Sequence, residues 1–430
     1  MSGPAAEVRA GIIVTGTEVL TGKTSDRNGP WVSERLGELG IEVAHITVVG
    51  DRADDLEAAL RFLVDRGIDL IVTTGGLGPT ADDLTTEVVA GFAGREMVLD
   101  ERMERRITAI IEEFAKRMKF DPEGARDGTR KQAMIPEGAI PLDPVGTAPG
   151  VVVEAGEALV MVLPGPPREL QGMWPAALAC EPVAALVERA PQSETATMKM
   201  FGVPESTLAK SLREIEAEIL IERLEITTCL RRGAELEIDV RYLAADAGLR
   251  DALFDGLRER HQRFIYTERG ETIDELVAAA LAGRRLALAE SCTAGLLAAR
   301  VTDRPGASDY FAGGVVAYSN EAKTALLGVP MELIEEHGAV SPEVAVAMAD
   351  GALARFGADT GVAVTGIAGP DGGTAGKPVG YVCICAKTSD GRSLARDLKL
   401  PGGRGDVRDR SVSVSLHMLR RLLIGEDLPL

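Results

Sequence analysis

The sequence predicts an α/β protein of two or three domains, in which mostly parallel sheets are covered by helices. Apolar segments of strand length alternate with segments of helical periodicity along most of the chain. The 430 residues are too many for one ordinary hydrophobic core. A hydrophobic fraction of 45% with 26% charged residues is typical of globular proteins, and the 4% of aromatic residues implies cores of Ala, Val, Leu and Ile.

The composition also argues against several classes of function. The net charge is −19 and no basic tail or stripe is present, so we expect no direct nucleic-acid partner. Five cysteines without a Cys-x-x-Cys pair suit a reducing compartment and give no zinc signature. We find no charged-then-apolar leader and no run of the ~18 apolar residues that a membrane span needs. We therefore expect a soluble, cytoplasmic protein without a membrane partner.

The first third of the chain alternates strands and helices, which predicts a mostly parallel sheet. Strands are expected at 8–15, 41–49 and 69–74, and helices at 31–39 and 53–65. Ligands of such sheets bind beyond the carboxyl ends of the strands. Glu18, in a polar turn at 16–18, and Asp26 follow the first strand and could belong to a carboxylate cluster there. Each of them alone is better explained as a solvated loop carboxylate.

A glycine-rich segment, 74–85, begins at the end of the third predicted strand. Three glycines let its backbone approach a ligand closely, namely Gly75, Gly76 and Gly78. We expect Thr80 to begin a helix whose free N–H groups suit a phosphate. Asp82 and Asp83 could hold a divalent cation that bridges to this phosphate. The alternative is a capping box formed by Thr80 and Asp83.

The region from 101 to 270 contains further elements and no clear catalytic motif. Its first part is expected to hold an amphipathic helix at 101–119, a polar loop at 121–130, strands at 151–153 and 159–163, and a stiff proline turn at 164–167 that leads into a helix. A small α+β unit follows, with strands at 195–203, 225–230 and 234–243, and helices at 204–220 and 249–260. Residues 266–270 are the expected junction to the last domain.

The last third of the chain is organised around 289–295, Ala-Glu-Ser-Cys-Thr-Ala-Gly. A buried strand is predicted at 285–289 and a helix at 295–301, so Ser291 falls at a strand-to-helix turn. There a hydroxyl can attack a carbonyl while unpaired backbone N–H groups stabilise the oxyanion. The alternative is that Ser291 or Thr293 only caps the helix.

A lysine downstream is a candidate base for this hydroxyl. After a predicted strand at 313–317, we expect Asn320 to cap a helix that runs to about Leu327. Lys323 would then be the third helical residue, where the positive end of the helix dipole favours a lowered pKa, although Glu321 opposes this. A partly neutral lysine can accept the proton of a serine hydroxyl. The alternative is an exposed helix lysine.

Two further segments offer groups for an anionic ligand. A strand predicted at 359–365 opens into a loop at 366–378, whose five glycines expose backbone N–H groups that can wrap an anion. A flexible surface loop is the alternative. Arg404 and Arg408 lie one turn apart at the start of a helix predicted to about 423, and could fork onto a phosphate.

The motifs of the first third resemble the molybdopterin-binding domain of the competence/damage-inducible CinA family. The matching segments are 16–18, 26–28, 74–85 and 163–170. The resemblance implies a three-layer α/β/α fold like that of MoaB and MogA, and metal-dependent cleavage of ADP-ribose by a divalent ion of open identity. Asp82 and Asp83 would lie at the metal–phosphate site, with Glu18 and Asp26 nearby. The nucleotide contacts would be Gly75, Gly76, Gly78, Thr80 and Thr85.

The last third resembles the nicotinamide-nucleotide amidohydrolase domain of the same family, over segments 289–295, 313–323, 337–341, 365–370 and 377–380. The resemblance implies hydrolysis of nicotinamide mononucleotide to nicotinate mononucleotide and ammonia, a step of NAD recycling, without a cofactor. Ser291 would be the nucleophile, Lys323 its base and Tyr318 a neighbour that assists the proton transfer. The substrate contacts would be Thr293, Asn320, Thr365, Gly366, Gly369, Arg404 and Arg408.

One residue departs from the family pattern, since Ala294 stands where a glycine is usual. Its methyl group is tolerated if φ there is negative, whereas a positive φ would put the oxyanion geometry in doubt. The resemblance also divides the chain into a molybdopterin-binding-like domain at 1–174, a KH-like α+β module at 175–267 and an amidase domain at 268–430, and it implies a homodimer. The middle module lacks the Gly-x-x-Gly loop that would clamp a nucleic acid.

The family name suggests an alternative of a different class. The chain would then be a non-catalytic nucleotide- or pterin-binding accessory protein in competence or in the DNA-damage response. The acidic charge argues against direct contact with DNA in that role.

Overall fold

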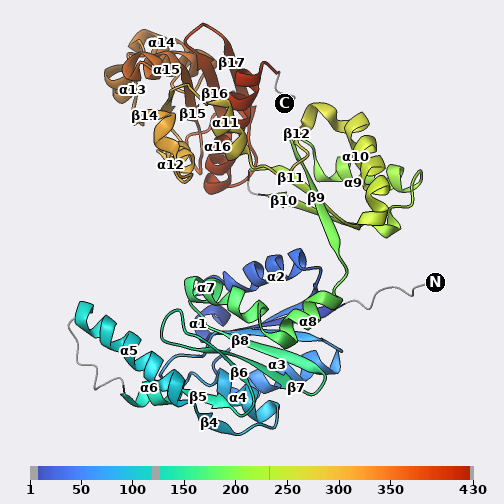
Figure 1. Cartoon of the computed structure of the whole chain (residues 1–430). Coiled ribbons are helices and arrows are strands. Elements are labelled where there is room, and N and C mark those ends of the chain that lie inside the picture. The colour runs from blue at the N-terminus through green and yellow to red at the C-terminus, as the bar shows by residue number, and fades with distance from the viewer. Residues whose placement is uncertain (1–7, 119–125, 232, 427–430) are drawn as a thin grey trace. The chain divides into compact units, whose positions relative to one another are not determined.

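The computed structural model describes residues 8–118, 126–231 and 233–426, which divide into two compact units, Met1–Glu194 and Thr195–Leu430 (Figure 1). Helices and strands alternate in both units, which confirms the predicted α/β class. Among the described residues, no single helix has the length and apolar composition to cross a membrane. One helix pair, Pro167–Leu178 with Glu181–Arg189, meets those two criteria when joined across its 79° bend.

The first unit is built on a six-stranded sheet with helices on both faces (Figure 1). The strand order is β2-β1-β3-β8-β7-β6, in which β2, β1, β3 and β8 are parallel, β7 pairs antiparallel with β8, and β6 pairs antiparallel with β7. The strands are β1 (Arg9–Thr15), β2 (Glu42–Val49), β3 (Leu70–Thr74), β6 (Ile140–Leu142), β7 (Gly150–Ala155) and β8 (Ala158–Leu163). The helices are α1 (Thr17–Leu20), α2 (Asn28–Glu38), α3 (Ala53–Asp65), α4 (Thr85–Phe92), α5 (Glu101–Met118), α6 (Arg126–Gln132), α7 (Pro167–Leu178) and α8 (Glu181–Arg189).

Strand β1 shows why this sheet needs two helical layers. Its side chains alternate between two buried clusters, with Ile12 packed against α2, α7 and α8, and Ile13 packed against α3 and α4. A strand buried on both faces reads as a continuous apolar run, as it does here. A separate two-stranded sheet, β4 (Met97–Leu99) with β5 (Met134–Pro136), lies beside α4.

Several local expectations differ from the structure in this unit. The polar turn predicted at 16–18 includes the start of α1. The loop predicted at 121–130 contains the start of α6, and its residues 121–125 lie outside the described part of the chain. The unit extends beyond the predicted boundary at 174, because α7 continues to Leu178 and α8 packs into the same core through Val183 and Leu186.

The second unit contains two sheets (Figure 1). The first is four-stranded, ordered β10-β11-β9-β12, and the second is five-stranded, ordered β14-β13-β15-β16-β17. The strands are β9 (Ser193–Phe201), β10 (Glu225–Arg231), β11 (Glu235–Leu243), β12 (Ile265–Thr267), β13 (Leu286–Glu290), β14 (Phe311–Val316), β15 (Thr360–Gly366), β16 (Tyr381–Thr388) and β17 (Ser393–Lys399). The helices are α9 (Glu205–Glu216), α10 (Ala247–His261), α11 (Ile273–Ala280), α12 (Leu296–Thr302), α13 (Asn320–Leu327), α14 (Met331–His337), α15 (Pro342–Phe356) and α16 (Arg404–Ile424).

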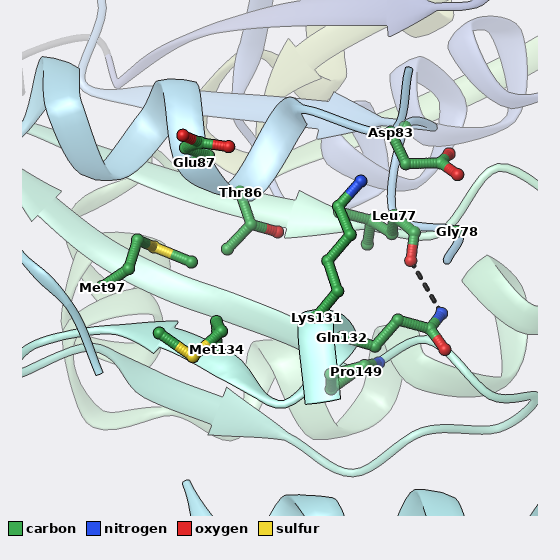
Figure 2. Close-up of a pocket in the computed structure, with 11 residues that line it drawn as sticks. Leu77, Gly78, Asp83, Thr86, Glu87, Met97, Lys131, Gln132, Met134 and Pro149 are labelled. Carbon is green, nitrogen blue, oxygen red and sulfur yellow. Dashed lines mark hydrogen bonds between the residues drawn. The ribbon is translucent and has the colours of Figure 1, made fainter. Parts of the chain in front are cut away.

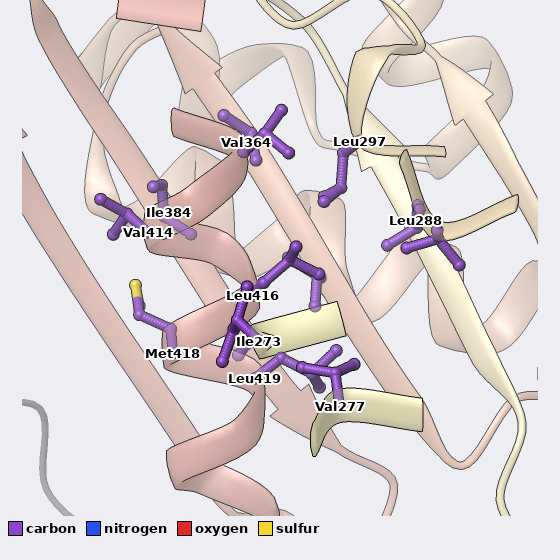
Figure 3. Close-up of a cluster of buried hydrophobic side chains, with 14 of the residues drawn as sticks. Ile273, Val277, Leu288, Leu297, Val364, Ile384, Val414, Leu416, Met418 and Leu419 are labelled. Carbon is purple, nitrogen blue, oxygen red and sulfur yellow. The ribbon is translucent and has the colours of Figure 1, made fainter. Parts of the chain in front are cut away.

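The five-stranded sheet is also covered on both faces. Strand β13 sends Leu288 into a cluster with α11, α12 and α16, which Figure 3 shows, and Ala289 into a cluster with α13, α14 and α15. Strands β14, β13 and β15 run parallel, so their carboxyl ends meet at one edge of the sheet. This edge carries the Ser291 turn and the loop that leads to Lys323.

A buried polar contact joins the four-stranded sheet to α16. Glu235 of β11 accepts a hydrogen bond from Tyr266 at 2.9 Å and lies 3.2 Å from Nε2 of His417. Phe201 stacks on the His417 ring with a centroid distance of 3.8 Å. Burial alone would raise the pKa of Glu235, but its hydrogen bonds with His417 and Tyr266 outweigh this and lower it.

Candidate active sites

Backbone pairing brings the predicted nucleophile and the loop before the predicted base to the same place. Glu290, the last residue of β13, pairs with Val316, the last residue of β14. The N–H of Ala317 then donates to the Glu290 carbonyl at 2.8 Å, and the N–H of Ser291 donates to the Val364 carbonyl at 2.9 Å. The chain therefore leaves both strands side by side.

Lys323 reaches the serine from the first turns of α13. Its Nζ lies 3.1 Å from Oγ of Ser291. It also donates to the carbonyl oxygens of Ala317 at 3.2 Å and Tyr318 at 3.4 Å. The helix is capped by Ser319, whose hydroxyl accepts from the N–H of Ala322 at 3.1 Å. The prediction that Asn320 is the cap was therefore wrong by one residue, and Lys323 is the fourth helical residue.

Burial controls the charge of this lysine. Lys323 is 1% exposed and Ser291 is 7% exposed. Burial lowers the pKa of Lys323, because an ammonium group loses its hydration there. Glu321, which was expected to oppose a lowered pKa, is fully exposed and is not among the causes of the shift. Within the described chain, no carboxylate forms an ion pair with the Lys323 ammonium group.

The helix after Ser291 is capped by a residue that the sequence did not indicate. The carboxylate of Glu290 accepts hydrogen bonds from the N–H groups of Gly295 at 2.9 Å, Leu297 at 3.0 Å and Ala298 at 2.8 Å. Neither Ser291 nor Thr293 caps α12, so that alternative was wrong. A signal for Glu290 was present, because it is the one charged residue in the apolar strand Leu-Ala-Leu-Ala-Glu, and it is only 1% exposed.

The backbone of the turn leaves two donors near the serine. Because Glu290 occupies the N–H groups of the helix, they are not free for an oxyanion, contrary to expectation. In the described part of the chain, the N–H groups of Cys292 and Thr293 donate to no other residue. Ala294 adopts φ = 49°, the left-handed conformation in which its methyl group is disfavoured. The methyl group of Ala294 was expected to be tolerated only if φ were negative, and this condition is not met.

The two predicted phosphate ligands hold loops in place. Arg404 donates to the Gly369 carbonyl at 2.8 Å and to the hydroxyl of Tyr318 at 3.1 Å. Arg408 donates to the Thr293 carbonyl at 2.9 Å, directly beyond the serine turn. Tyr318 is 57% exposed, and only its carbonyl contacts Lys323. Its hydroxyl is therefore held by Arg404, away from a direct contact with the pair.

The remaining predicted substrate contacts differ in how exposed they are. Thr293 and Thr365 are fully buried, and the Thr365 hydroxyl donates to the Ala339 carbonyl at 2.8 Å. Asn320 is exposed at the start of α13. Gly366 lies beside the nucleophile turn, because a Cβ there would come within 3.0 Å of Sγ of Cys292. Glycine is therefore required where β15 approaches the serine turn.

The first unit has a cavity of about 660 Å³ beyond the carboxyl ends of β1 and β3, where parallel sheets bind ligands. All four predicted metal ligands line it, namely Glu18, Asp26, Asp82 and Asp83. The three loop glycines line it too: Gly75, Gly76 and Gly78. Thr85 is buried below the loop, where a Cβ on Gly76 would come within 2.2 Å of its Oγ1.

The predicted helix start at Thr80 was wrong. Helix α4 begins at Thr85, and Thr80 lies in a turn that Asp83 closes by accepting from the Thr80 N–H at 2.9 Å. Such local carboxylate hydrogen bonds compete with helix formation. The Thr80 hydroxyl lies 2.5 Å from one oxygen of Asp82 and 2.5 Å from one oxygen of Asp83. The hydrogen bond between the Thr80 hydroxyl and Asp82 lowers the pKa of Asp82.

The carboxylates of the cavity form a pair rather than a cluster. Among the described residues, no group of three or more His, Cys, Asp or Glu side chains is arranged to hold a metal ion. Asp26 instead accepts from the N–H groups of Asn28 and Gly29 at the start of α2. Asp82 and Asp83 remain close together through Thr80. Two carboxylates fit Mg²⁺, which is commonly bound by one or two carboxylates together with substrate phosphates.

Comparisons with known proteins assign both parts of the chain. Residues 270–423 match the CinA C-terminal domain, and residues 11–183 match the probable molybdopterin binding domain. A CinA-like protein of Mycolicibacterium gilvum is 59% identical over 97% of this chain and 99% of its own length. A CinA-like protein of Mycobacterium tuberculosis is 56% identical over 98% of this chain and 99% of its own length. The chain belongs to the CinA family.

A solved structure of the competence/damage inducible protein CihA from Agrobacterium tumefaciens is 42% identical, covering 35% of this chain and 94% of that one with a TM-score of 0.34. In this CinA-family chain, the structure brings Ser291 and Lys323 together and gathers the loop glycines around one cavity. It does not bring the hydroxyl of Tyr318 to the Ser–Lys pair.

Proposed function

We propose that the C-terminal domain hydrolyses the carboxamide of nicotinamide mononucleotide to nicotinate mononucleotide and ammonia. The observation that carries this proposal is the distance of 3.1 Å between Nζ of a buried lysine with a lowered pKa and Oγ of Ser291. A neutral amine at that distance can take the hydroxyl proton, and general-base geometry requires about 2.6–3.2 Å.

The proposed reaction has two stages. Ser291 Oγ attacks the carboxamide carbon while its proton passes to Lys323 Nζ, and the N–H groups of Cys292 and Thr293, which follow the serine in the turn, would donate to the oxyanion. Lys323 then protonates the leaving nitrogen, so ammonia departs and an ester to Ser291 remains. Water attacks this ester with Lys323 again as base, which releases the carboxylate and restores the serine hydroxyl.

Ammonia release from nicotinamide mononucleotide tests the proposal directly. The S291A variant should lose at least about 1,000-fold in kcat while keeping the wild-type melting temperature, because nucleophile and base act as a unit. The matched control is S308A, which removes an exposed hydroxyl remote in sequence. Retained turnover in S291A would remove Ser291 as the nucleophile. Ligand binding without any turnover by the wild type would instead favour a non-catalytic accessory protein.

For the first unit we propose metal-dependent cleavage of ADP-ribose at its diphosphate. The observation that favours it is the charge of the cavity. Besides Arg27, the charged residues that line it are acidic: Glu18, Asp26, Asp51, Asp82, Asp83 and Glu169. A diphosphate would be repelled from these carboxylates unless a divalent cation lay between them. Asp82 and Asp83 would hold that cation, which would polarise a phosphoryl oxygen.

The test measures ADP-ribose cleavage with added Mg²⁺ or Mn²⁺. The D82N/D83N variant should lose the activity, whereas D54N, which changes an exposed carboxylate on α3, should keep it. Activity in excess chelator would reject the metal site. Because the Ser–Lys pair lies in the other unit, S291A should leave this activity unchanged.

A further inference from the structure

A second, smaller pocket opens from the same glycine loop. It has a volume of about 250 Å³ and is drawn in Figure 2. It shares Gly76, Leu77, Gly78, Asp83 and Gln132 with the 660 Å³ cavity, so the two spaces adjoin along the loop. Pockets that hold a whole small ligand measure about 300–1,000 Å³. The smaller pocket therefore suits one part of a ligand whose remainder lies in the larger cavity.

Two methionines form the apolar wall of this small pocket. Met97 comes from β4 and Met134 from β5, and Figure 2 shows both side chains directed into the same space as Thr86 of α4. Neither methionine belongs to the buried hydrophobic clusters that the described residues form. Their thioethers are only partly buried. Thioethers adapt to flat rings and make favourable contacts with aromatic edges.

Three polar side chains of the small pocket lie where it meets the loop, and Thr86 and Glu87 of α4 line it elsewhere. The Lys131 ammonium donates to the carbonyl of Thr80, and Asp83 lines both spaces. Gln132 is 7% exposed and donates to the Leu77 carbonyl at 2.9 Å, which holds the shared wall in position. A methionine wall with polar groups only at its edges, Glu87 and Thr86 of α4 among them, does not suit a free sugar, whose hydroxyls would need partners on every side. It suits a heteroaromatic ring attached to a phosphate-bearing group.

We propose that the pocket between Met97 and Met134 binds the heteroaromatic ring of a nucleotide whose diphosphate lies along the glycine loop in the larger cavity. This rests on the function proposed for the first unit and adds the part of the ligand that the carboxylates do not contact. The two methionines then determine the preference for a nucleotide over a diphosphate that has no ring. The side chains that would bind the ring come from β4 and β5. Because neither strand carries a predicted metal ligand, ring binding can be altered without changing the metal site.

Methyl NMR of the full-length chain tests the proposal on the unmodified protein. The twelve methionines are labelled with ¹³C at the ε-methyl group, and M97L and M134L assign the two resonances of interest. With Mg²⁺ present, ADP-ribose should move both resonances by ring-current shifts, whereas inorganic pyrophosphate should leave both in place. Binding of each probe is measured in parallel by calorimetry.

Affinity measurements provide the second arm. The M97Q/M134Q variant should bind ADP-ribose at least tenfold more weakly and pyrophosphate within twofold of the wild type. The control is V98Q, because Val98 follows Met97 on β4, is 42% exposed and is not among the residues that line the pocket. ADP-ribose should bind V98Q as it binds the wild type.

The outcomes separate this proposal from the function on which it rests. If both probes bind but neither methionine resonance moves, or if M97Q/M134Q loses both probes equally, the ring site is overturned while the diphosphate site stands. If the wild type binds neither probe with Mg²⁺, the nucleotide function of the cavity fails, and the ring site fails with it.

Discussion

Replacing Lys323 with methionine tests the central contact of the C-terminal domain. Methionine fills a similar volume and cannot take a proton, so K323M removes the base while the site stays packed. General-base catalysis at hydrogen-bond distance contributes about 100- to 10,000-fold, which corresponds to roughly 3–5 kcal/mol in the activation free energy. We therefore expect kcat for ammonia release to fall by that factor. S291A/K323M should lose little more than either single variant, because the two groups act together.

The pH dependence follows from the burial of the same lysine. The reaction needs the neutral amine, so kcat should rise with pH through the lowered pKa of Lys323, below the ordinary lysine value of about 10.4. Between those two pKa values the unfolded chain binds more protons than the folded protein. The wild type should therefore lose stability, relative to K323M, as the pH falls from about 10.4 toward the folded pKa.

Stopped-assay ammonia measurements and urea unfolding between neutral pH and pH 10 give both quantities. The S308A variant serves as the control in each series, since its exposed hydroxyl lies outside the pair. Two results would refute the reasoning. One is a K323M enzyme with wild-type kcat, and the other is a free energy of unfolding whose pH dependence is the same in K323M and the wild type.

Three further predictions concern stability, each measured by urea denaturation. E290Q should lower the free energy of unfolding by about 1–3 kcal/mol, because its amide NH₂ replaces an oxygen that accepts from the helix N–H groups; an unchanged midpoint would contradict this capping role. A294G should raise it by up to about 1 kcal/mol, since glycine adopts φ = 49° without the methyl clash; a lower midpoint would contradict the strain. E235Q should lower it by about 1–3 kcal/mol, because His417 loses a buried charged partner. Equal stability of E235Q and the wild type would show that this contact contributes nothing.

The meeting of Ser291 and Lys323 was expected from the resemblance to the amidohydrolase domain, and the structure gives its cause, since the ends of the parallel strands β13 and β14 share one edge of the sheet. The approximate positions of β13 and β14 followed from apolar runs and the end of α13 from Gly328, whereas the start of α13 was misplaced by one residue because Ser319 is the cap. The cause of the lowered lysine pKa was not predictable. The sequence offered a helix dipole, whereas the structure shows burial, which depends on packing from segments remote in the chain.

The errors in the first unit have a local cause. Thr80 carries the residue pattern of a helix start, but Asp83 closes a turn on it and the helix begins later, at Thr85. An acidic residue three positions after a threonine can cap a helix or close a local turn, and residue propensity does not decide between the two. The carboxylates were likewise predicted as one cluster. Asp26 does line the cavity, but one of its oxygens accepts from two backbone N–H groups at the start of α2, and the described residues form no group of three such ligands.

The pairing of Glu290 with Val316 has a consequence for transplanting this chemistry. The separation between hydroxyl and amine follows from two adjacent strand ends and one short connection, and owes nothing to long flexible loops. A protein engineer would thus need to copy only a small set of elements. These are two neighbouring parallel strands in this register, the turn after one strand with its glutamate bound to the helix N–H groups, and the first turn of a helix after the other strand. Any doubly wound protein in which the carboxyl ends of two such strands are buried from solvent could accept these elements.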